Sequence, residues 1–427
     1  MYQPDIETMP LTQLRELQNT RLRQTLERVY QRVPFYRKVM DERGLKPQDI
    51  QGVQDLPKLP FTRKEDLRDH YPYGLFAEPA DRIARIHASS GTTGKPTVVG
   101  YTRRDLDLFD EVVARSLVCA GARPGMKLHN AYGYGLFTGG LGMHGGATRL
   151  GMAVIPVSGG MTERQLTILE DFRPEVICCT PSYAQTLSEA LQTKGIDPAD
   201  LPVQYAILGA EPWTDAIRQQ VEAGLQVQAT NIYGLSEIIG PGVSQEAVDE
   251  RGTGSYVWED HFYPEVVDRD TGEPLPHGEE GVLVFTTLTK EAMPLLRYWT
   301  NDICRIQYDP NGSRTHIKMS PILGRADDML IIRGVNLFHT QVEEVIEQMD
   351  DLTPNYQLIV TRRGSLDQVE VRVEVAAGAN SQSTELRDRL RQKIKDTIGL
   401  SMEITLEQPG RIPRSQGGKL ARIVDQR

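Results

Sequence analysis

The sequence has no long hydrophobic run. None of its apolar stretches reaches the roughly 18 uninterrupted residues of a membrane span, so no role in a membrane is expected. The first residues, Met1 to Asp5, form neither a basic leader nor an apolar segment, and no secretory signal is expected. Cysteine is also scarce: four occur in 427 residues, without a Cys-x-x-Cys pair, at positions 119, 178, 179 and 304. We therefore expect buried, reduced thiols and a cytoplasmic location.

The chain also lacks an excess of basic residues. The 48 Lys and Arg are outnumbered by 58 Asp and Glu, which gives a formal net charge of −10. Binding to a nucleic-acid backbone needs a basic face, so nucleic acid is not expected as the main partner. Hydrophobic residues make up 39% and charged residues 25%, as in ordinary soluble globular proteins. At about 150 residues per domain, the length corresponds to two or three domains.

The first two-thirds of the chain favour an α/β fold. Apolar residues between positions 11 and 33 recur at steps of three and four, which predicts one amphipathic helix or two in series, ended by Pro34. Short apolar strands then alternate with helices, which is typical of a mostly parallel sheet. The strands are expected at 83–86, 97–99, 153–156, 176–179 and 205–208, and the helices at 103–120, 162–172, 183–194 and 214–223.

The last third changes character. From about residue 240 the pattern is rich in β-strands, and a boundary is expected near residues 324–328. Beyond it, strands at 329–332, 357–360, 369–375 and 402–406 and helices at 340–349 and 383–398 form a small α+β unit. We therefore expect a large N-terminal α/β domain over residues 1–324, with mostly parallel sheets flanked by helices and a β-rich subdomain. A small mobile α+β C-terminal domain is expected over residues 325–427.

The strongest local signal is the Ser-Ser-Gly-Thr-Thr-Gly-Lys-Pro-Thr segment at residues 89–97. Its two glycines and five hydroxyl residues place N–H and O–H donors beside one cation, which suits phosphate oxygens. It is not a Walker A loop, because two residues separate the glycines and Pro96 follows the lysine. Pro96 disfavours helix at Lys95, so the loop is expected to join two strands. The alternative is a flexible surface hairpin; the composition favours phosphate binding by Ser90, Gly91, Thr92, Thr93, Gly94 and Lys95.

Further motifs follow this loop in a fixed order. They are Gly-Ala-Glu-Pro at 209–212, Tyr-Gly-Leu-Ser-Glu at 233–237, Tyr-Trp-Thr-Asn-Asp at 298–302, a Gly-Arg segment at 324–336 and a late lysine, Lys419. This series resembles the adenylate-forming (acyl-CoA synthetase/ligase) superfamily over nearly the whole chain. Residues 130–140, 236–242 and 258–264 narrow the resemblance to the phenylacetate-CoA ligase branch.

The resemblance implies an AMP-forming ligase. A carboxylate would attack the α-phosphorus of ATP, with Mg²⁺, to give an acyl-adenylate, and the thiol of coenzyme A would then displace AMP. The implied acid is an aryl carboxylic acid, with phenylacetate first. Another aryl acid, of the anthranilate or hydroxybenzoate type, stays open, as does transfer to a carrier protein, because both acceptors present a pantetheine thiol. Relatives of this branch are commonly dimers, so a homodimer is also implied.

The resemblance assigns roles to single residues. Glu237 would help to hold Mg²⁺, Asp302 would accept the ribose hydroxyls, and Arg325 would contact ribose or phosphate. Lys419 would be the catalytic lysine, carried into the site by the small domain and removed from it through a hinge at Asp327. The remaining nucleotide-binding residues would be Glu211, Tyr233, Gly234 and Ser236, with Tyr233 packed on adenine.

These residues also have simpler interpretations. Glu237, Asp302 and Asp327 could be solvated or turn-capping acids, Arg325 a surface charge, and Lys419 part of a basic tail. Lys419 also departs from the branch pattern, because Gly417-Gly418 adds one residue before it and Leu420 follows.

The acid pocket is expected beside two aromatic residues. By resemblance, Tyr132 and Phe137 flank the aromatic ring, and Gly209, Ala210 and Pro241 complete the pocket. The alternative is that both aromatic side chains pack in the core. Lys64 matches a lysine of the branch that reaches phosphate. No structural zinc is expected, because Cys304 and His316 alone do not make a set of four ligands.

Overall fold

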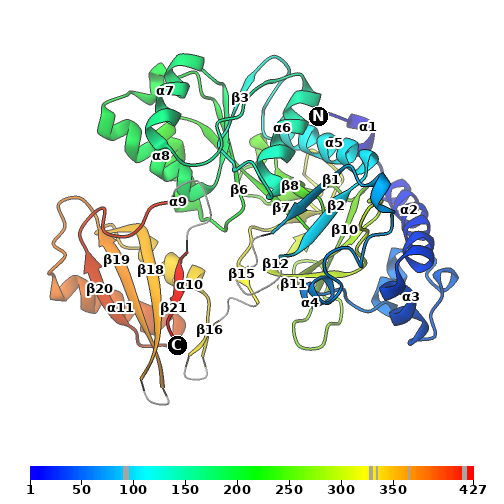
Figure 1. The fold of residues 1–427 in the computed structure, drawn as a ribbon. Coiled ribbons are helices and arrows are strands. Elements are labelled where there is room, and N and C mark those ends of the chain that lie inside the picture. The colour runs from blue at the N-terminus through cyan, green and yellow to red at the C-terminus, as the bar shows by residue number, and fades with distance from the viewer. Residues whose placement is uncertain (90–95, 327–329, 333–334, 364–365, 416–420) are drawn as a thin grey trace.

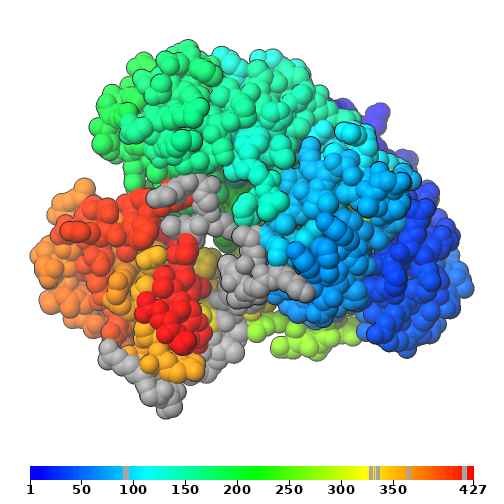
Figure 2. Space-filling view, in the orientation of Figure 1, coloured from blue at the N-terminus to red at the C-terminus, as the bar shows by residue number. Residues whose placement is uncertain are grey.

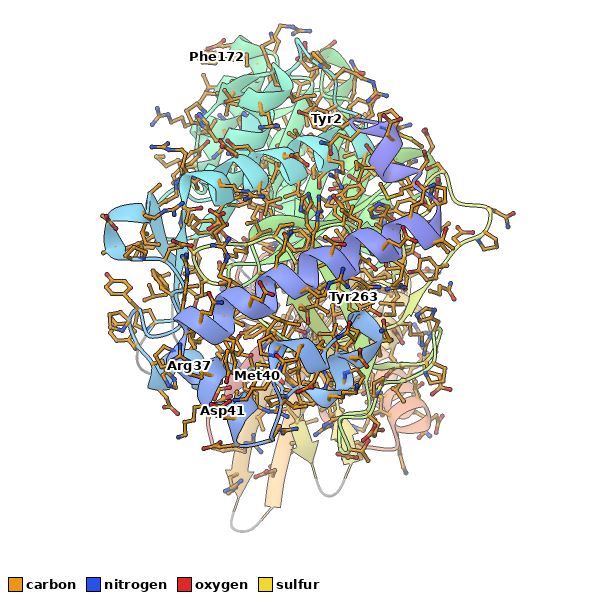
Figure 3. The ribbon with its side chains drawn as sticks, turned by 90° about the vertical axis from the view of Figure 1, so that its right-hand side faces the viewer. Tyr2, Arg37, Met40, Asp41, Phe172 and Tyr263 are labelled. Carbon is orange, nitrogen blue, oxygen red and sulfur yellow. The ribbon has the colours of Figure 1, made fainter. Side chains whose placement is uncertain are left out.

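The computed structural model describes residues 1–89, 96–326, 330–332, 335–363, 366–415 and 421–427. The chain starts with the helices α1 (Pro4–Glu7), α2 (Leu11–Arg32) and α3 (Pro34–Asp41). Figure 3 shows α2 lying diagonally across one face of the large body, with Tyr263 beside it. Leu14, Leu22, Leu26 and Val29 of α2 are buried, as the periodicity predicted, but Leu11 at its start is 45% exposed. Pro34 ends α2 but also starts α3, because the first turn of a helix tolerates the missing N–H of proline.

A mixed sheet forms the centre of the large body. Its nine described strands run in the order β13-β14-β9-β8-β7-β6-β5-β3-β4. β4 (Ala153–Ile155), β3 (Lys127–Asn130), β5 (Val176–Cys179), β6 (Tyr205–Gly209) and β7 (Gln228–Leu235) are parallel to one another. β8 (Gly240–Glu246), β9 (Ser255–Val257), β14 (Lys318–Met319) and β13 (Ile306–Gln307) continue the sheet in antiparallel fashion.

Helices connect and cover the parallel strands. They are α5 (Arg103–Cys119), α6 (Thr138–Leu150), α7 (Thr162–Phe172), α8 (Pro181–Lys194) and α9 (Asp215–Leu225), coloured cyan to green in Figure 1. The predicted α/β class is confirmed, and α7 and β5 have the expected bounds. The glycine-rich helix α6 was not predicted. It lies against α5, where an added Cβ at Gly142 would come within 2.3 Å of the Phe109 ring.

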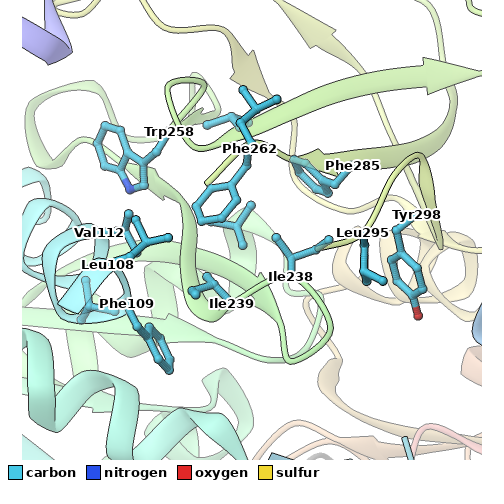
Figure 4. Packing of buried hydrophobic residues seen from close by; sticks show 14 of the residues in the cluster. Leu108, Phe109, Val112, Ile238, Ile239, Trp258, Phe262, Phe285, Leu295 and Tyr298 are labelled. Atoms are coloured by element: carbon cyan, nitrogen blue, oxygen red, sulfur yellow. The ribbon is translucent and has the colours of Figure 1, made fainter. Parts of the chain in front are cut away.

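Two smaller sheets complete the large body. A four-stranded sheet has the order β10-β11-β12-β15, with β10 (Phe262–Val267), β11 (Gly281–Thr287), β12 (Tyr298–Cys304) and β15 (Gly324–Arg325). β1 (Arg85–Ala88) and β2 (Val98–Tyr101) form an antiparallel pair, and α4 (Lys64–Asp69) precedes them. Figure 4 shows the core that joins the sheets: Ile238 and Ile239 pack among Phe109, Phe262 and Leu295.

The C-terminal residues form a separate layer. β20 (Glu403–Glu407), β19 (Leu366–Val375), β18 (Leu352–Arg363) and β21 (Ile423–Asp425) make a four-stranded sheet with its own core. The short pair β16 (Leu330–Ile332) and β17 (Val335–Leu337) and the helices α10 (His339–Glu347) and α11 (Thr384–Ile398) belong to the same unit. In Figures 1 and 2 this unit, orange to red, lies beside the green part of the large body.

Several contacts between the two units are polar. Arg414 Nε donates to Glu189 Oε2 on α8 at 3.1 Å. The hydroxyl of Thr186, one turn earlier on the same helix, donates to the carbonyl of Ser415 at 3.4 Å. Thr214, which caps α9, also donates to Glu347 on α10. Polar contacts of this kind can be exchanged for water, so the interface is suited to change.

Two further expectations concern the chain as a whole. All four cysteines are buried and free, which confirms the expectation of buried thiols. Within the described ranges, no helix combines the length and the apolar character needed to cross a bilayer.

Candidate active site

The candidate residues gather at the carboxyl ends of the parallel strands. Gly209 ends β6 and is followed by Ala210 and Glu211, Ser236 and Glu237 follow β7, and Tyr132 lies shortly after β3. Open α/β sheets bind ligands at this edge, because the loops there converge. Ser90, Gly91, Thr92, Thr93, Gly94 and Lys95, Asp327 and Lys419 lie outside the described residues.

The flanks of the loop at 89–97 are described. β1 and β2 are antiparallel neighbours, and the N–H of Ser89 donates to the carbonyl of Thr97 at 2.9 Å. The prediction that this loop joins two strands is therefore confirmed. Lys64 begins α4 two residues after Thr62, which bridges to Tyr298 on β12.

Asp302, Tyr233 and Arg325 form one cluster. The Tyr233 hydroxyl donates to Asp302 Oδ2 at 2.6 Å, and Arg325 Nη1 donates to Asp302 Oδ1 at 2.9 Å. The register of β12 and β15 makes Asp302 and Arg325 direct partners. Burial, with the charge of Asp302, raises the pKa of Tyr233 well above its ordinary value, so the phenol stays a hydrogen-bond donor. The Tyr233 ring also stacks on Phe285, with 6.3 Å between centroids.

Two close backbone approaches shape the ends of β6 and β7. An added Cβ at Gly209 would lie 2.2 Å from the carbonyl oxygen of Ile232, and one at Gly234 would lie 1.9 Å from that of Gly240. Only glycine fits at either position without a shift of the main chain. Gly234 is paired with Pro241 across β7 and β8, so these constraints place Pro241 against the same turn.

Glu211 follows a strained residue. Ala210 has φ of 75°, a region that non-glycine residues seldom occupy. The Ser182 hydroxyl, at the start of α8, donates to Glu211 Oε1 at 2.6 Å. The Ala210 conformation and this hydrogen bond hold the Glu211 carboxylate at the strand edge.

The two expected acid-pocket aromatics differ in exposure. Tyr132 is buried, and burial raises its pKa well above the ordinary value, while the Gly209 backbone lies close enough to oppose the shift. Phe137, the residue before α6, is 52% exposed. Tyr132 therefore fits either interpretation of the sequence, whereas the exposure of Phe137 does not fit the core alternative. Thr138 beside it shares a 3.0 Å hydrogen bond with Ser236, which ties this loop to the turn after β7.

Glu237 lies in a largely buried turn. The hydroxyl of Tyr298 donates to its Oε1 at 3.2 Å, and Lys290 Nζ donates to its main-chain oxygen at 3.2 Å. The Tyr101 hydroxyl donates to the carbonyl of Ile239 at 2.8 Å. Tyr101 and Lys290 were not among the site residues expected from the sequence. Their signal was faint, because a lysine in Thr-Lys-Glu is usually exposed.

The carboxylate of Glu237 is suited to bind a magnesium ion that arrives with a nucleotide. None of the described residues donates a hydrogen bond to Glu237 Oε2, so this oxygen is available to a cation. One carboxylate together with phosphate oxygens and waters is the usual magnesium environment. Over the described ranges, no group of three or more His, Cys, Asp or Glu could hold a metal by itself. His316 is engaged by main-chain groups of Val257, Glu259 and Ile6.

Comparisons with known proteins agree over the whole length. Residues 9–289 match the family described as "AMP-binding enzyme", and residues 334–427 match "AMP-binding enzyme C-terminal domain". The phenylacetate-coenzyme A ligase of Thermus thermophilus is 61% identical, with 100% of both chains covered. The Escherichia coli enzyme of the same name is 49% identical over 99% of this chain and 97% of its own.

A solved structure matches both units together. 2-Hydroxyisobutyryl-CoA ligase in its postadenylation state is 26% identical, with a TM-score of 0.92 over 99% of this chain and 92% of that chain. In its thioesterification state the same ligase gives a TM-score of 0.73 over 99% and 91%.

Proposed function

Because the chain belongs to the family of AMP-binding enzymes, we propose that it is an AMP-forming phenylacetate-CoA ligase. The observation that carries this proposal is the 61% identity, over the full length of both chains, to a phenylacetate-coenzyme A ligase. The site geometry is compatible with that chemistry, because the Asp302 carboxylate is bonded to Tyr233 on β7 and Glu237 lies in the turn that follows the same strand.

In the proposed first step, a carboxylate oxygen of phenylacetate attacks the α-phosphorus of ATP. The bond from that phosphorus to the bridging oxygen breaks, and pyrophosphate leaves. We assign the ribose hydroxyls to Asp302, supported by Arg325 at 2.9 Å, and the adenine to the surroundings of Tyr233, Gly234, Ser236 and Glu211. The phosphates are assigned to residues 90–95. Magnesium, held through Glu237, would neutralise charge on the leaving pyrophosphate.

The acid itself is assigned to the loops after β3, β6 and β7. The buried Tyr132 and the exposed Phe137 would bound the aromatic ring, and Gly209, Ala210 and Pro241 would line the rest of the pocket. Flat apolar walls suit an unsubstituted phenyl ring.

In the proposed second step, the thiolate sulfur of coenzyme A attacks the carbonyl carbon and AMP leaves. We propose that Lys419 serves the first step and moves away for the second, by rotation of the domain 325–427 against the domain 1–324 about Asp327. The higher TM-score to the postadenylation state, 0.92 against 0.73, supports an arrangement suited to the first step. The hydrogen bond from the N–H of Ala326 to the carbonyl of Asn301, 2.7 Å, ties the connection to the large domain.

Assays of the purified protein would test the proposal. With ATP, magnesium and coenzyme A, we expect AMP and a thioester in equal amounts, and the highest kcat/KM for phenylacetate among phenylacetate, benzoate, anthranilate and 4-hydroxybenzoate. AMP release that does not depend on any acid would overturn the ligase assignment. Acid-dependent AMP release that requires a carrier protein and ignores coenzyme A would replace it with carrier loading.

A further inference from the structure

Lys290 is a buried cation behind the turn that carries Glu237. It lies between β11 and β12, its residue is only 1% exposed, and its Nζ is 3.2 Å from the Glu237 carbonyl oxygen. The same ammonium lies 4.9 Å from the centre of the Tyr101 ring. In the part of the chain that the structure describes, no carboxylate lies within ion-pair distance of it. A buried ammonium without a carboxylate partner opposes folding, so packing alone does not account for a lysine here.

The residues on both sides of Lys290 fix its position. The Thr289 hydroxyl hydrogen-bonds with His261 Nδ1 at 2.9 Å. The N–H of Glu291 donates to the carboxylate of Asp105 at 2.7 Å, and the next N–H along the chain donates to the same carboxylate at 2.8 Å. These anchors come from separate parts of the chain, so the segment has little freedom to turn the ammonium elsewhere.

The Glu237 turn is in this way held at three points. Lys290 holds the main chain at Glu237, the Tyr101 hydroxyl holds it at Ile239 at 2.8 Å, and the Tyr298 hydroxyl holds the carboxylate at 3.2 Å. Among the residues that the structure describes, none donates to the other carboxylate oxygen, Oε2, which leaves it to a cation. A side chain that fixes a metal-binding carboxylate without touching the substrate acts on the geometry of the first step.

We propose that Lys290 is a positioning residue for adenylate formation, which orients Glu237 toward the magnesium ion of the bound nucleotide. This inference rests on the proposed function. We therefore expect the positive charge of Lys290 to lower the free energy of unfolding and to raise the rate of adenylate formation.

The variant Lys290→Met tests this, because methionine keeps most of the volume and removes the charge and the donor. We expect an unchanged or higher Tm, because a buried cation without a carboxylate partner is lost. We expect kcat for phenylacetate-dependent pyrophosphate exchange to fall about 30-fold, with little change in KM for phenylacetate. Conversion of premade phenylacetyl-adenylate and coenzyme A to thioester should stay within about twofold. Tyr101→Phe, which removes the second main-chain contact and keeps the ring, should change exchange in the same direction by a smaller factor.

A matched control is Lys318→Met. Lys318 is also buried, but it contacts Glu250 at 2.6 Å and Asp309 at 2.8 Å, and it lies on β14. Its loss should lower Tm, because two carboxylates are left unpaired. The exchange rate of the folded protein should stay unchanged, because Lys318 does not contact the Glu237 turn.

A binding measurement separates this inference from the proposed function. By calorimetry with a non-hydrolysable ATP analogue, Lys290→Met should reduce the gain in affinity that magnesium gives by about tenfold, while affinity for AMP without magnesium is unchanged. Unchanged exchange and an unchanged magnesium gain in the variant would overturn the role of Lys290, as would equal losses in both half-reactions. A wild-type protein without acid-dependent exchange would overturn the proposed function, and the calorimetric comparison would still decide the role of Lys290.

Discussion

The Tyr233 hydroxyl donates a 2.6 Å hydrogen bond to the carboxylate of Asp302, across 69 positions of sequence. Arg325 approaches the other carboxylate oxygen at 2.9 Å. Motifs that stand far apart in the sequence therefore meet in one charged cluster. These two donors hold the carboxylate in a fixed orientation.

Asp302→Asn should weaken nucleotide use. The amide carries no charge and accepts hydrogen bonds at one oxygen only, so it would bind ribose hydroxyls poorly. Its NH2 group would also face an N–H or O–H donor of Arg325 or Tyr233. We expect kcat/KM for ATP to fall about 100-fold, or about 2.7 kcal/mol of transition-state stabilisation. Steady-state kinetics at varied ATP would measure this. Tyr233→Phe removes one hydroxyl and should cost about fivefold by the same assay. An Asp302→Asn protein with an unchanged KM for ATP would contradict the ribose assignment.

Gly234→Ala should distort the turn before Glu237. The new Cβ would lie 1.9 Å from the Gly240 carbonyl oxygen, so the main chain of β7 or β8 has to move. We expect the free energy of unfolding to fall by about 2 kcal/mol. The rate of adenylate formation should fall by a larger fraction than the stability does. Thermal unfolding and pyrophosphate exchange would measure the two effects. Gly133→Ala is the control, because a Cβ there meets nothing within 4 Å. Equal behaviour of the two variants would refute the steric argument.

Phe137→Ala should affect the acid and leave the fold intact. Because the side chain is 52% exposed, its removal should change the free energy of unfolding by less than about 0.5 kcal/mol. KM for phenylacetate should rise about tenfold if the ring bounds the pocket. Tyr132→Ala is the contrasting change: it empties a buried site and should cost about 3 kcal/mol of stability. An unchanged KM in Phe137→Ala would remove Phe137 from the proposed pocket.

The small domain should show a pH-dependent stability through Glu343. Burial raises the pKa of this carboxyl from 4.5 to about 7, against the opposing charge of Arg422 and with Glu347 and Glu211 adding to the shift. Between these pH values the folded state holds a proton that the unfolded state has released, so stability falls as pH rises. Glu343→Gln should therefore match the wild type near pH 4.5 and become more stable than it as pH approaches about 7, by up to about 3 kcal/mol.

Urea unfolding at several pH values would measure the difference for Glu343→Gln. The exposed neighbour Glu344, changed to Gln, serves as the control for loss of a charge from the same helix, and its effect should be smaller than that of Glu343→Gln near pH 7. A stability gain for Glu343→Gln that is already complete at pH 4.5 would be incompatible with the raised pKa.

Much of the architecture could be predicted where periodicity and burial agree. β5 was expected at 176–179 and α7 at 162–172, and both have these bounds. Helix α6 escaped prediction because glycines at 139, 140, 142, 145 and 146 lower its intrinsic propensity. Gly142, Gly145 and Gly146 instead permit close packing on α5, where an added Cβ at Gly146 would lie 2.3 Å from Val113. The local sequence pattern does not predict such tertiary contacts.

The site was predictable as a set of motifs and not as a geometry. The contact between Arg325 and Asp302 depends on the register of β12 and β15. A strand of two residues, at 324–325, has too little sequence pattern to predict that register. Lys290 reaches Glu237 across 53 positions, in a segment that reads as an exposed turn. Its burial follows from the anchors at Asp105 and His261, which only the folded chain brings together.

We propose that this chain activates an acid as its adenylate with the help of Lys419. Exchange of labelled pyrophosphate into ATP, without coenzyme A, measures that step alone. We expect exchange that requires phenylacetate in the wild type and falls at least about 100-fold in Lys419→Ala. Premade phenylacetyl-adenylate should still be converted to the thioester within about twofold of the wild-type rate. Exchange without any acid, or an equal loss of both half-reactions in Lys419→Ala, would contradict it.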